Sequence, residues 1–148
     1  SISCVQLLLN DPDLDIRLTH RGFSPLHVAI KSSSKYRFDI IKLLLPYFHD
    51  AIDHPSGIGE TPIQMAVQTC DLSIVNLILS YSPSLQVVYS TTGNSLLHES
   101  VLLDHYEITF RLLQTNMDAF IVNHHHQQPL DLASSKKMAD LLLEYTRI

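Results

Sequence analysis

The residues best suited to hold a metal ion are nine histidines, three of them consecutive at His124, His125 and His126. Consecutive side chains cannot all point the same way, whereas zinc sites separate their ligands by several residues on a turn or helix. We therefore interpret the run as a solvated turn and expect no metal and no cofactor. Metal binding by the run stays open as the alternative.

Nucleophilic chemistry would have to use Cys4 or Cys70, and neither has a base placed beside it in the sequence. The chain contains no GxSxG, no Gly-rich phosphate loop and no HExxH. Both cysteines are interpreted as packing thiols. The sequence thus predicts no catalytic residues and no enzyme. A toxin-like or metal-dependent enzyme fragment is the competing hypothesis, and it would need a set of catalytic residues that none of these motifs provides.

Composition narrows the class of protein. The 148 residues are 45% hydrophobic and 17% charged, which is typical of a globular domain. No apolar run approaches the roughly 20 residues of a membrane span, so membrane insertion is not expected. A net charge of −5 argues against a nucleic-acid partner. Two cysteines without a framework, and no secretory signal at the first residues, favour the cytoplasm and/or the nucleus.

The elements that would position any site come from an internal repeat. A short motif recurs at residues 22–29, 59–66, 93–100 and, in degenerate form, 126–133, with spacings of 37, 34 and 33 residues. A second apolar block follows each copy, at residues 40–45, 74–79, 108–113 and 138–143. Each unit is therefore a turn, a short helix and a longer helix, and neighbouring units must stack to bury their apolar faces.

Three kinds of residue mark the start of each short helix. A proline fits the first helical position, a hydroxyl before it can cap the first turn, and a glycine upstream suits a turn with positive φ. They are Pro25, Pro62 and Pro129; Ser24, Thr61 and Ser95; and Gly22, Gly59 and Gly93.

The motif is similar to T-P-L-H-x-A, the signature of the ankyrin repeat at a period of about 33 residues. The resemblance implies an all-α solenoid of helix-turn-helix units joined by short hairpin-like turns, with residues 1–148 as one ankyrin repeat domain. It also implies that His27 and His98 hydrogen-bond locally to brace the turns. The expected segments are a partial repeat at 1–21 (second helix and turn), full repeats at 22–58, 59–92 and 93–125, and a C-terminal capping repeat at 126–148.

The chain departs from the family pattern in two regions. Asp11, Pro83 and Asn116 stand where ankyrin repeats usually have a glycine after the second helix, so we expect irregular helix ends. Residues 32–37 are three residues longer than their counterpart in the next repeat and should bulge outward.

The resemblance also implies the function, a protein–protein interaction module acting as a scaffold or adaptor through its turn tips and concave face. We expect Phe23, Ile58, Leu102 and Leu103 to be hot spots, although packing between helices would bury some of them. The predicted turn tips are His20, Arg21, Phe23, Ile58, Glu60, Thr91, Thr92, Asn94, His124, His125 and Gln127, and the predicted helix ends are Lys31, Ser32, Gln68, Thr69, Leu102 and Leu103.

Charge supplies an alternative function. Residues 43–110 contain seven Asp or Glu and no Lys or Arg. Such a field could steer a basic partner segment, as in an inhibitor-of-NF-κB-like regulator that masks a basic segment of a transcription factor. An ordinary solvated face is the other interpretation, and the identity of the partner and the oligomeric state are left open.

Overall fold

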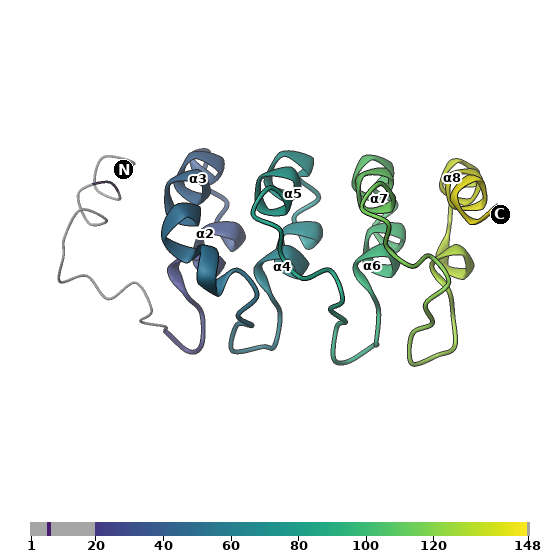
Figure 1. The fold of residues 1–148 in the computed structure, drawn as a ribbon, viewed down its shortest axis with the longest axis horizontal. Coiled ribbons are helices and arrows are strands. Elements are labelled where there is room, and N and C mark those ends of the chain that lie inside the picture. Colours follow the sequence, from purple (N-terminus) through teal and green to yellow (C-terminus); the bar gives the residue numbers. More distant parts are fainter. Residues whose placement is uncertain (1–5, 7–19, 148) are drawn as a thin grey trace. The chain divides into compact units, whose positions relative to one another are not determined.

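The structure is a computed structural model that describes residue 6 and residues 20–147, and its helices recur in pairs along the chain (Figure 1). Cys4 and nearly all of the expected partial repeat at residues 1–21 lie outside the described residues. The elements are α2 (Pro25–Lys31), α3 (Arg37–Phe48), the 3₁₀ helix η1 (His49–Ala51), α4 (Pro62–Gln68), α5 (Leu72–Leu79), α6 (Leu96–Leu102), α7 (Tyr106–Leu113), the 3₁₀ helix η2 (Pro129–Leu132) and α8 (Lys136–Thr146).

The chain forms two compact units. The N-terminal unit comprises Ser1–Thr69 and Ser73–Pro83, and the C-terminal unit comprises Cys70–Leu72 and Ser84–Ile148. Helices α2, α3 and α4 pack together in the first unit, whereas α6, α7, η2 and α8 pack together in the second.

The predicted all-α class is confirmed. The only extended pairings among the described residues are isolated bridges between His20 and Phe23 and between Val88 and Ser95, which close hairpin-like turns. Three of the short helices begin at Pro25, Pro62 and Leu96, as the repeat predicted. The fourth also begins at the predicted Pro129, but η2 is a single 3₁₀ turn in place of an α-helix.

Two of the predicted hydroxyl caps, Ser24 and Ser95, hold the first turns of α2 and α6. Ser24 Oγ accepts a 3.4 Å hydrogen bond from the backbone N–H of His27. Ser95 Oγ does the same for His98, also at 3.4 Å. In each case the side chain of the third helical residue accepts a bond from the backbone N–H of the cap residue. Two backbone donors that the helix leaves unpaired are thereby satisfied.

Apolar side chains fill the core of each unit. Ile30, Ile41 and Leu45 are fully buried between α2 and α3, and Leu97 and Leu112 are fully buried between α6 and α7. These residues come from the two apolar blocks of each repeat, as the periodicity predicted. Burial of about 25 cal/mol per Å² of apolar surface supplies the main driving force for such packing.

The ends of the second helices are more regular than we expected. Ser82 and Asn116 adopt left-handed backbone conformations, with φ of 52° and 60°. They therefore take the conformation that a glycine provides in this position of the repeat, at the steric cost that a Cβ imposes. Residues 32–36 form the predicted bulging loop and are largely exposed.

Among the described residues, no helix combines the length and the apolar composition that crossing a membrane requires.

Candidate functional site

The turn tips of the N-terminal unit approach each other closely at two glycines. A Cβ on Gly22 would lie 2.5 Å from Cα of Gly57, well inside van der Waals contact. Gly22 also has a φ of +79°, a conformation that few other residues adopt easily. These contacts hold the first tip against the second, with His20 and Arg21 exposed beside them.

The second tip presents an apolar side chain to solvent. Ile58 is 54% exposed. Two predicted partner-binding residues meet next to it, because Gln68 Nε2 donates to Glu60 Oε1 at 3.3 Å. Thr69 is half-buried and its hydroxyl donates to the carbonyl of Ala66, so it contributes to the end of α4.

Phe23 and Lys31 lie together at the first repeat. Phe23 is half-buried, so its prediction as an exposed hot spot is met only in part. The Lys31 ammonium lies 5.3 Å from the centroid of the Phe23 ring, within cation–π range. Ser32, at the end of α2, accepts a bond on its carbonyl from Arg37.

The tips of the C-terminal unit are joined by a backbone bond from His124 N–H to the carbonyl of Thr92. The His124 ring lies against Gly93, where a Cβ would collide with it. Thr91, His124 and His125 are exposed and Thr92 is half-buried. Solvent and a partner can therefore reach this tip.

Asn94 is a correction to the predicted tip. Its side chain is only 3% exposed, and its Oδ1 accepts a 2.9 Å bond from Asn123 Nδ2. The amide pair ties one turn to the next inside the C-terminal unit. Asn94 therefore holds the tip in place and does not present its side chain to a partner.

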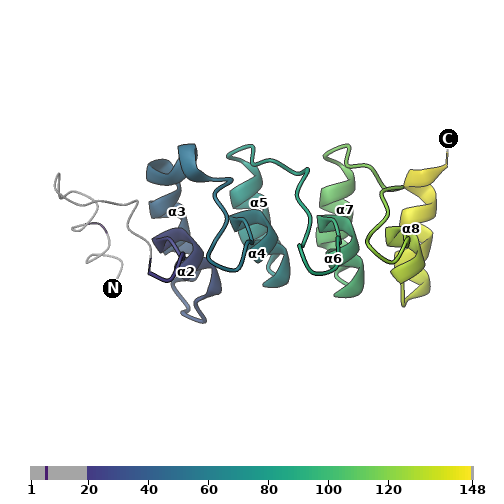
Figure 2. The same cartoon turned by 90° about the horizontal axis from the view of Figure 1, so that it is seen from below.

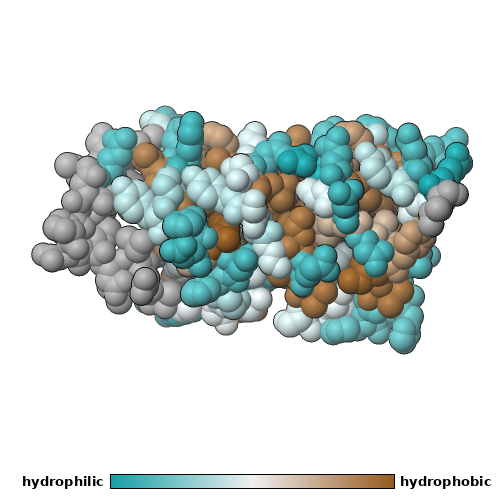
Figure 3. All heavy atoms as spheres, viewed as in Figure 1, coloured by the Kyte–Doolittle hydropathy of each residue, from teal (hydrophilic) through white to brown (hydrophobic). Residues whose placement is uncertain are grey.

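The end of α6 presents the most apolar part of the predicted surface. Leu102 is 51% exposed and Leu103 is 40% exposed. Figure 3 shows hydrophobic residues reaching the surface in the part of the chain that carries α6–α8. Isolated exposed leucines are ordinary, but an adjacent pair on a fixed corner is a candidate contact site.

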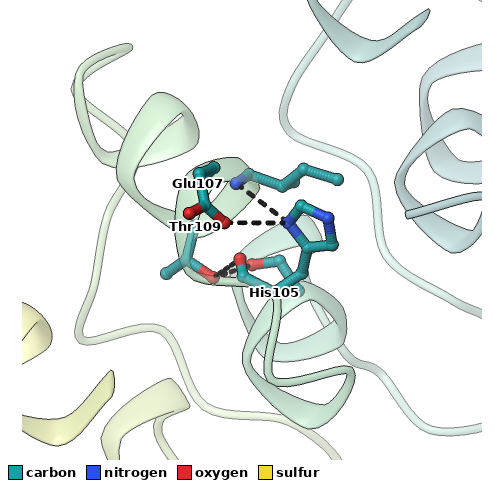
Figure 4. Close-up of polar contacts among 5 residues, drawn as sticks. His105, Glu107 and Thr109 are labelled. Carbon is teal, nitrogen blue, oxygen red and sulfur yellow. Dashed lines mark hydrogen bonds and ion pairs between the residues drawn. The ribbon is translucent and has the colours of Figure 1, made fainter. Parts of the chain in front are cut away.

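A polar network fixes that corner (Figure 4). Thr109 Oγ1 donates to Ser100 Oγ at 2.9 Å, which joins α7 to α6. The Nδ1 atom of His105 accepts from the backbone N–H of Ile108 and lies 3.8 Å from a Glu107 oxygen. The connection after Leu103 is therefore held by side chains from both helices.

The motif histidines brace the turns, as the resemblance implied. Nδ1 of His27 accepts from the backbone N–H of Ser24 at 3.2 Å, and Nε2 donates to the carbonyl of His54 at 3.0 Å. His98 makes the equivalent bonds to Ser95 and to Gln127. Because a carbonyl can only accept, the proton lies on Nε2. Burial lowers the pKa of both imidazoles, so the neutral form is favoured.

Sequence reasoning missed several exposed apolar side chains. Val28 is 55% exposed on α2, and its place at the unspecified position of T-P-L-H-x-A could have revealed it. Phe120 and Val122 are also exposed, at 49% and 48%. They stand two residues apart in the segment that leads to the fourth turn. The repeat motif does not cover this segment, so it could not predict their exposure.

The interpretation of Cys70 as a packing thiol was wrong. Cys70 is exposed, and its left-handed backbone forms the turn after α4. Among the described residues, no group of three His, Cys, Asp or Glu side chains is arranged to hold a metal ion.

The acidic residues of the middle repeats are partly engaged within the units. In the C-terminal unit, Asp104 accepts a 2.7 Å bond from Ser135 Oγ. In the N-terminal unit, Asp50 lies 2.7 Å from the imidazole of His49. Asp53 is exposed. Some of these acids therefore make local contacts, and the exposed ones carry negative charge that can attract a basic partner.

With this geometry established, comparisons with known proteins address the family. The sequence profile described as ankyrin repeats matches residues 1–88, in three copies. The chain belongs to the ankyrin repeat family. Its repeats are a protein-interaction fold rather than a catalytic one, so the predicted interaction module is supported as the general function.

Two ankyrin relatives extend the comparison. The mouse B-cell lymphoma 3 protein homolog is 30% identical over 150 residues, which cover 96% of this chain and 32% of the relative. The solved ankyrin repeat domain of Bcl-3, described as a unique member of the IkappaB protein family, has a TM-score of 0.82 and 28% identity over 97% of this chain and 63% of that domain. The chain therefore spans about a third of the curated relative it matches.

Proposed function

We propose that the chain binds a partner protein through the turn tips and short-helix ends that each unit presents. The observation that carries this proposal is the exposure of large apolar side chains at those positions. Ile58 in the N-terminal unit and Leu102 in the C-terminal unit are each more than half exposed. Apolar anchors surrounded by polar residues are the usual centre of a protein interface.

Polar side chains at the predicted contact positions support the same proposal. Glu60 and Gln68, in the same repeat as Ile58, bond to each other. Thr91, His124 and His125 form an exposed polar tip in the C-terminal unit. Such groups exclude water and set orientation more than they add affinity. The proposed role is binding alone, with no catalysis.

A second candidate is an IkappaB-like regulator that masks a basic segment of a transcription factor, in the cytoplasm or the nucleus. Two observations favour it: the likeness to the Bcl-3 domain, which is described as an IkappaB family member, and the stretch from residue 43 to residue 110 without Lys or Arg. Nucleic acid is not proposed as a partner, because the net charge of −5 would repel it.

The test compares proteins captured from a cell extract by the wild-type chain and by two variants, Ile58→Asp and Leu102→Asp. Each buries a carboxylate in the proposed contact and should lose the specific partner. Leu143→Asp is the matched control, since Leu143 is 40% exposed on α8 and belongs to neither a turn tip nor a short-helix end. If a partner is still captured by both anchor variants and its capture is lost only with the control variant, the proposed surface is refuted.

The regulator hypothesis is tested by the identity of the captured proteins. A transcription factor of the NF-κB type should be among the proteins that depend on the anchors, and deleting its basic segment should weaken capture. If capture depends on the anchors but no such factor is present, the module stands and the regulator does not.

A further inference from the structure

Positive charge is concentrated in one part of the N-terminal unit. Residues 20–48 contain five Lys or Arg and one Asp. The later part of the unit, residues 49–69 and 73–83, contains three Asp or Glu and no Lys or Arg. The first described repeat is therefore basic, in contrast to the acidic turn that follows it.

The lysines of this repeat form no ion pair with a carboxylate of residues 20–147. Lys31, Lys35 and Lys42 are exposed, and among the described residues none of them forms an ion pair with an acid. Two of them lie over aromatic rings instead, with Lys35 Nζ 5.0 Å from the centroid of Tyr36 and Lys31 over Phe23. Their charge is available to an external anion.

Aromatic side chains are exposed between these lysines. Tyr36 is 44% exposed and Phe38 is 38% exposed. Phe38 and Lys42 are four residues apart on α3 and so share one helix face. Lys35 and Tyr36 belong to the loop between α2 and α3, which Figure 2 shows at the end of the two helices.

We propose that the lysine–aromatic surface, made of Lys31, Lys35, Tyr36, Phe38 and Lys42, binds an acidic protein segment in which Asp or Glu alternates with bulky apolar residues. The lysines supply the complementary charge, and the rings supply apolar contact area. Disordered segments with acidic–apolar alternation have this chemistry. The proposal goes beyond the function above, because it concerns the α2–α3 connection and the opposite charge.

A peptide fits this surface better than a nucleic acid does. Single-stranded nucleic acid carries one negative charge per nucleotide and binds along extended basic tracks. The three lysines lie within residues 31–42, a stretch with one acid, Asp39, and Asp50, Asp53 and Glu60 follow in the same unit. A short peptide needs only these three positive charges, whereas a nucleic acid needs a longer basic track, and residues 49–69 and 73–83 contain no Lys or Arg.

The test is an NMR titration of the ¹⁵N-labelled whole chain with a short synthetic peptide in which Glu alternates with Leu and Phe. Backbone amide shifts should cluster between residues 31 and 42 and diminish as salt is added. The same peptide with Gln in place of Glu should cause much smaller shifts. An oligothymidylate of similar length is the nucleic-acid arm. Absent or scattered shifts, or tighter binding of the oligonucleotide at these residues, would overturn the proposal.

Variants then separate charge from apolar contact. Lys31→Glu, Lys35→Glu and Lys42→Glu together should raise the Kd about tenfold or more, because three attractive contacts become repulsive. Lys136→Glu with Lys137→Glu is the control, since Lys137 also lies over a ring, that of Tyr106, but in the C-terminal unit. Tyr36→Ala with Phe38→Ala should weaken binding while leaving the charge intact. An unchanged Kd in either test variant contradicts the assignment.

Discussion

His98 Nε2 donates a 2.8 Å hydrogen bond to the carbonyl of Gln127, which lies 29 residues further along the chain. His27 makes the same kind of bond to the carbonyl of His54 at 3.0 Å, across 27 residues. Each imidazole therefore ties the start of one short helix to the next turn within its unit. This bond requires a proton on Nε2, whereas the bond that Nδ1 accepts from the backbone N–H of Ser95 or Ser24 requires that Nδ1 be unprotonated.

Acid should weaken both units through these histidines. Folding lowers their pKa below the ordinary value of 6.5, so just below that value the unfolded chain binds more protons than the folded one. Their contribution to stability is then fully present above about pH 6.5 and is lost as the pH falls toward the folded pKa. Urea midpoints measured at about pH 7.5 and about pH 5 will report the loss.

The control for this effect is His27→Gln with His98→Gln. Glutamine is the matched choice, because Gln64 occupies the same repeat position and its Oε1 accepts from Thr61 N–H at 2.8 Å. The double variant should lose less stability on acidification than the wild type. Equal losses would assign the pH dependence to other groups.

The contact between Gly22 and Gly57 predicts different outcomes for two similar substitutions. Gly22 and Gly59 both have positive φ, at +79° and +84°, so alanine strains the backbone at either. Only at Gly22 would the new methyl also meet backbone, at 2.5 Å from Gly57, whereas Gly59 has open space. Gly22→Ala should therefore cost about 1–3 kcal/mol more in unfolding free energy than Gly59→Ala. Equal denaturation midpoints would contradict the close approach of the tips.

Core truncation should distinguish two neighbours on α5. Ile78 is fully buried, whereas Leu77, which the repeat register favours as a core residue, is only half-buried. Ile78→Ala should cost about 2–5 kcal/mol, and Leu77→Ala should cost less. Thr91→Ala, at an exposed tip, should stay within about 0.5 kcal/mol. Chemical denaturation of the three variants checks the order, which would be wrong if Leu77→Ala were the most damaging.

Charge and apolar contact should act on different rate constants for a captured basic partner. Asp53→Lys with Glu60→Lys should slow association, because charges at the rim of an interface act mainly on encounter. Ile58→Asp should mainly speed dissociation. Surface plasmon resonance at two salt concentrations measures both. If the affinity changes neither with salt nor with the charge reversals, these acids form only a solvated face and take no part in binding.

Much of the fold could be predicted because it depends on local chemistry. Pro25, Pro62 and the cap residues Ser24 and Ser95 specify helix starts through φ and hydrogen-bonding capacity, which the sequence displays directly. The period then places the apolar blocks in the core. The left-handed conformation of Asn116, with φ of 60°, was not predicted, because its departure from the glycine of the family pattern indicated only an irregular helix end.

The candidate site was less predictable, since exposure depends on neighbours far along the chain. Asn94 was expected at a tip but is buried by its bond with Asn123, 29 residues away. Cys70 was expected in packing but lies in an exposed turn. The exposure of Ile58 and Leu102 was predicted correctly, because the ankyrin resemblance placed them at a turn tip and at a short-helix end.

Photo-crosslinking tests the central claim most directly. A benzoylphenylalanine placed at position 58 or 102 would bond covalently to whatever protein contacts that position, and position 143 serves as the control. We predict one shared crosslinked partner from positions 58 and 102 and none from position 143. Crosslinks from position 143 alone would contradict an interface at the turn tips and short-helix ends.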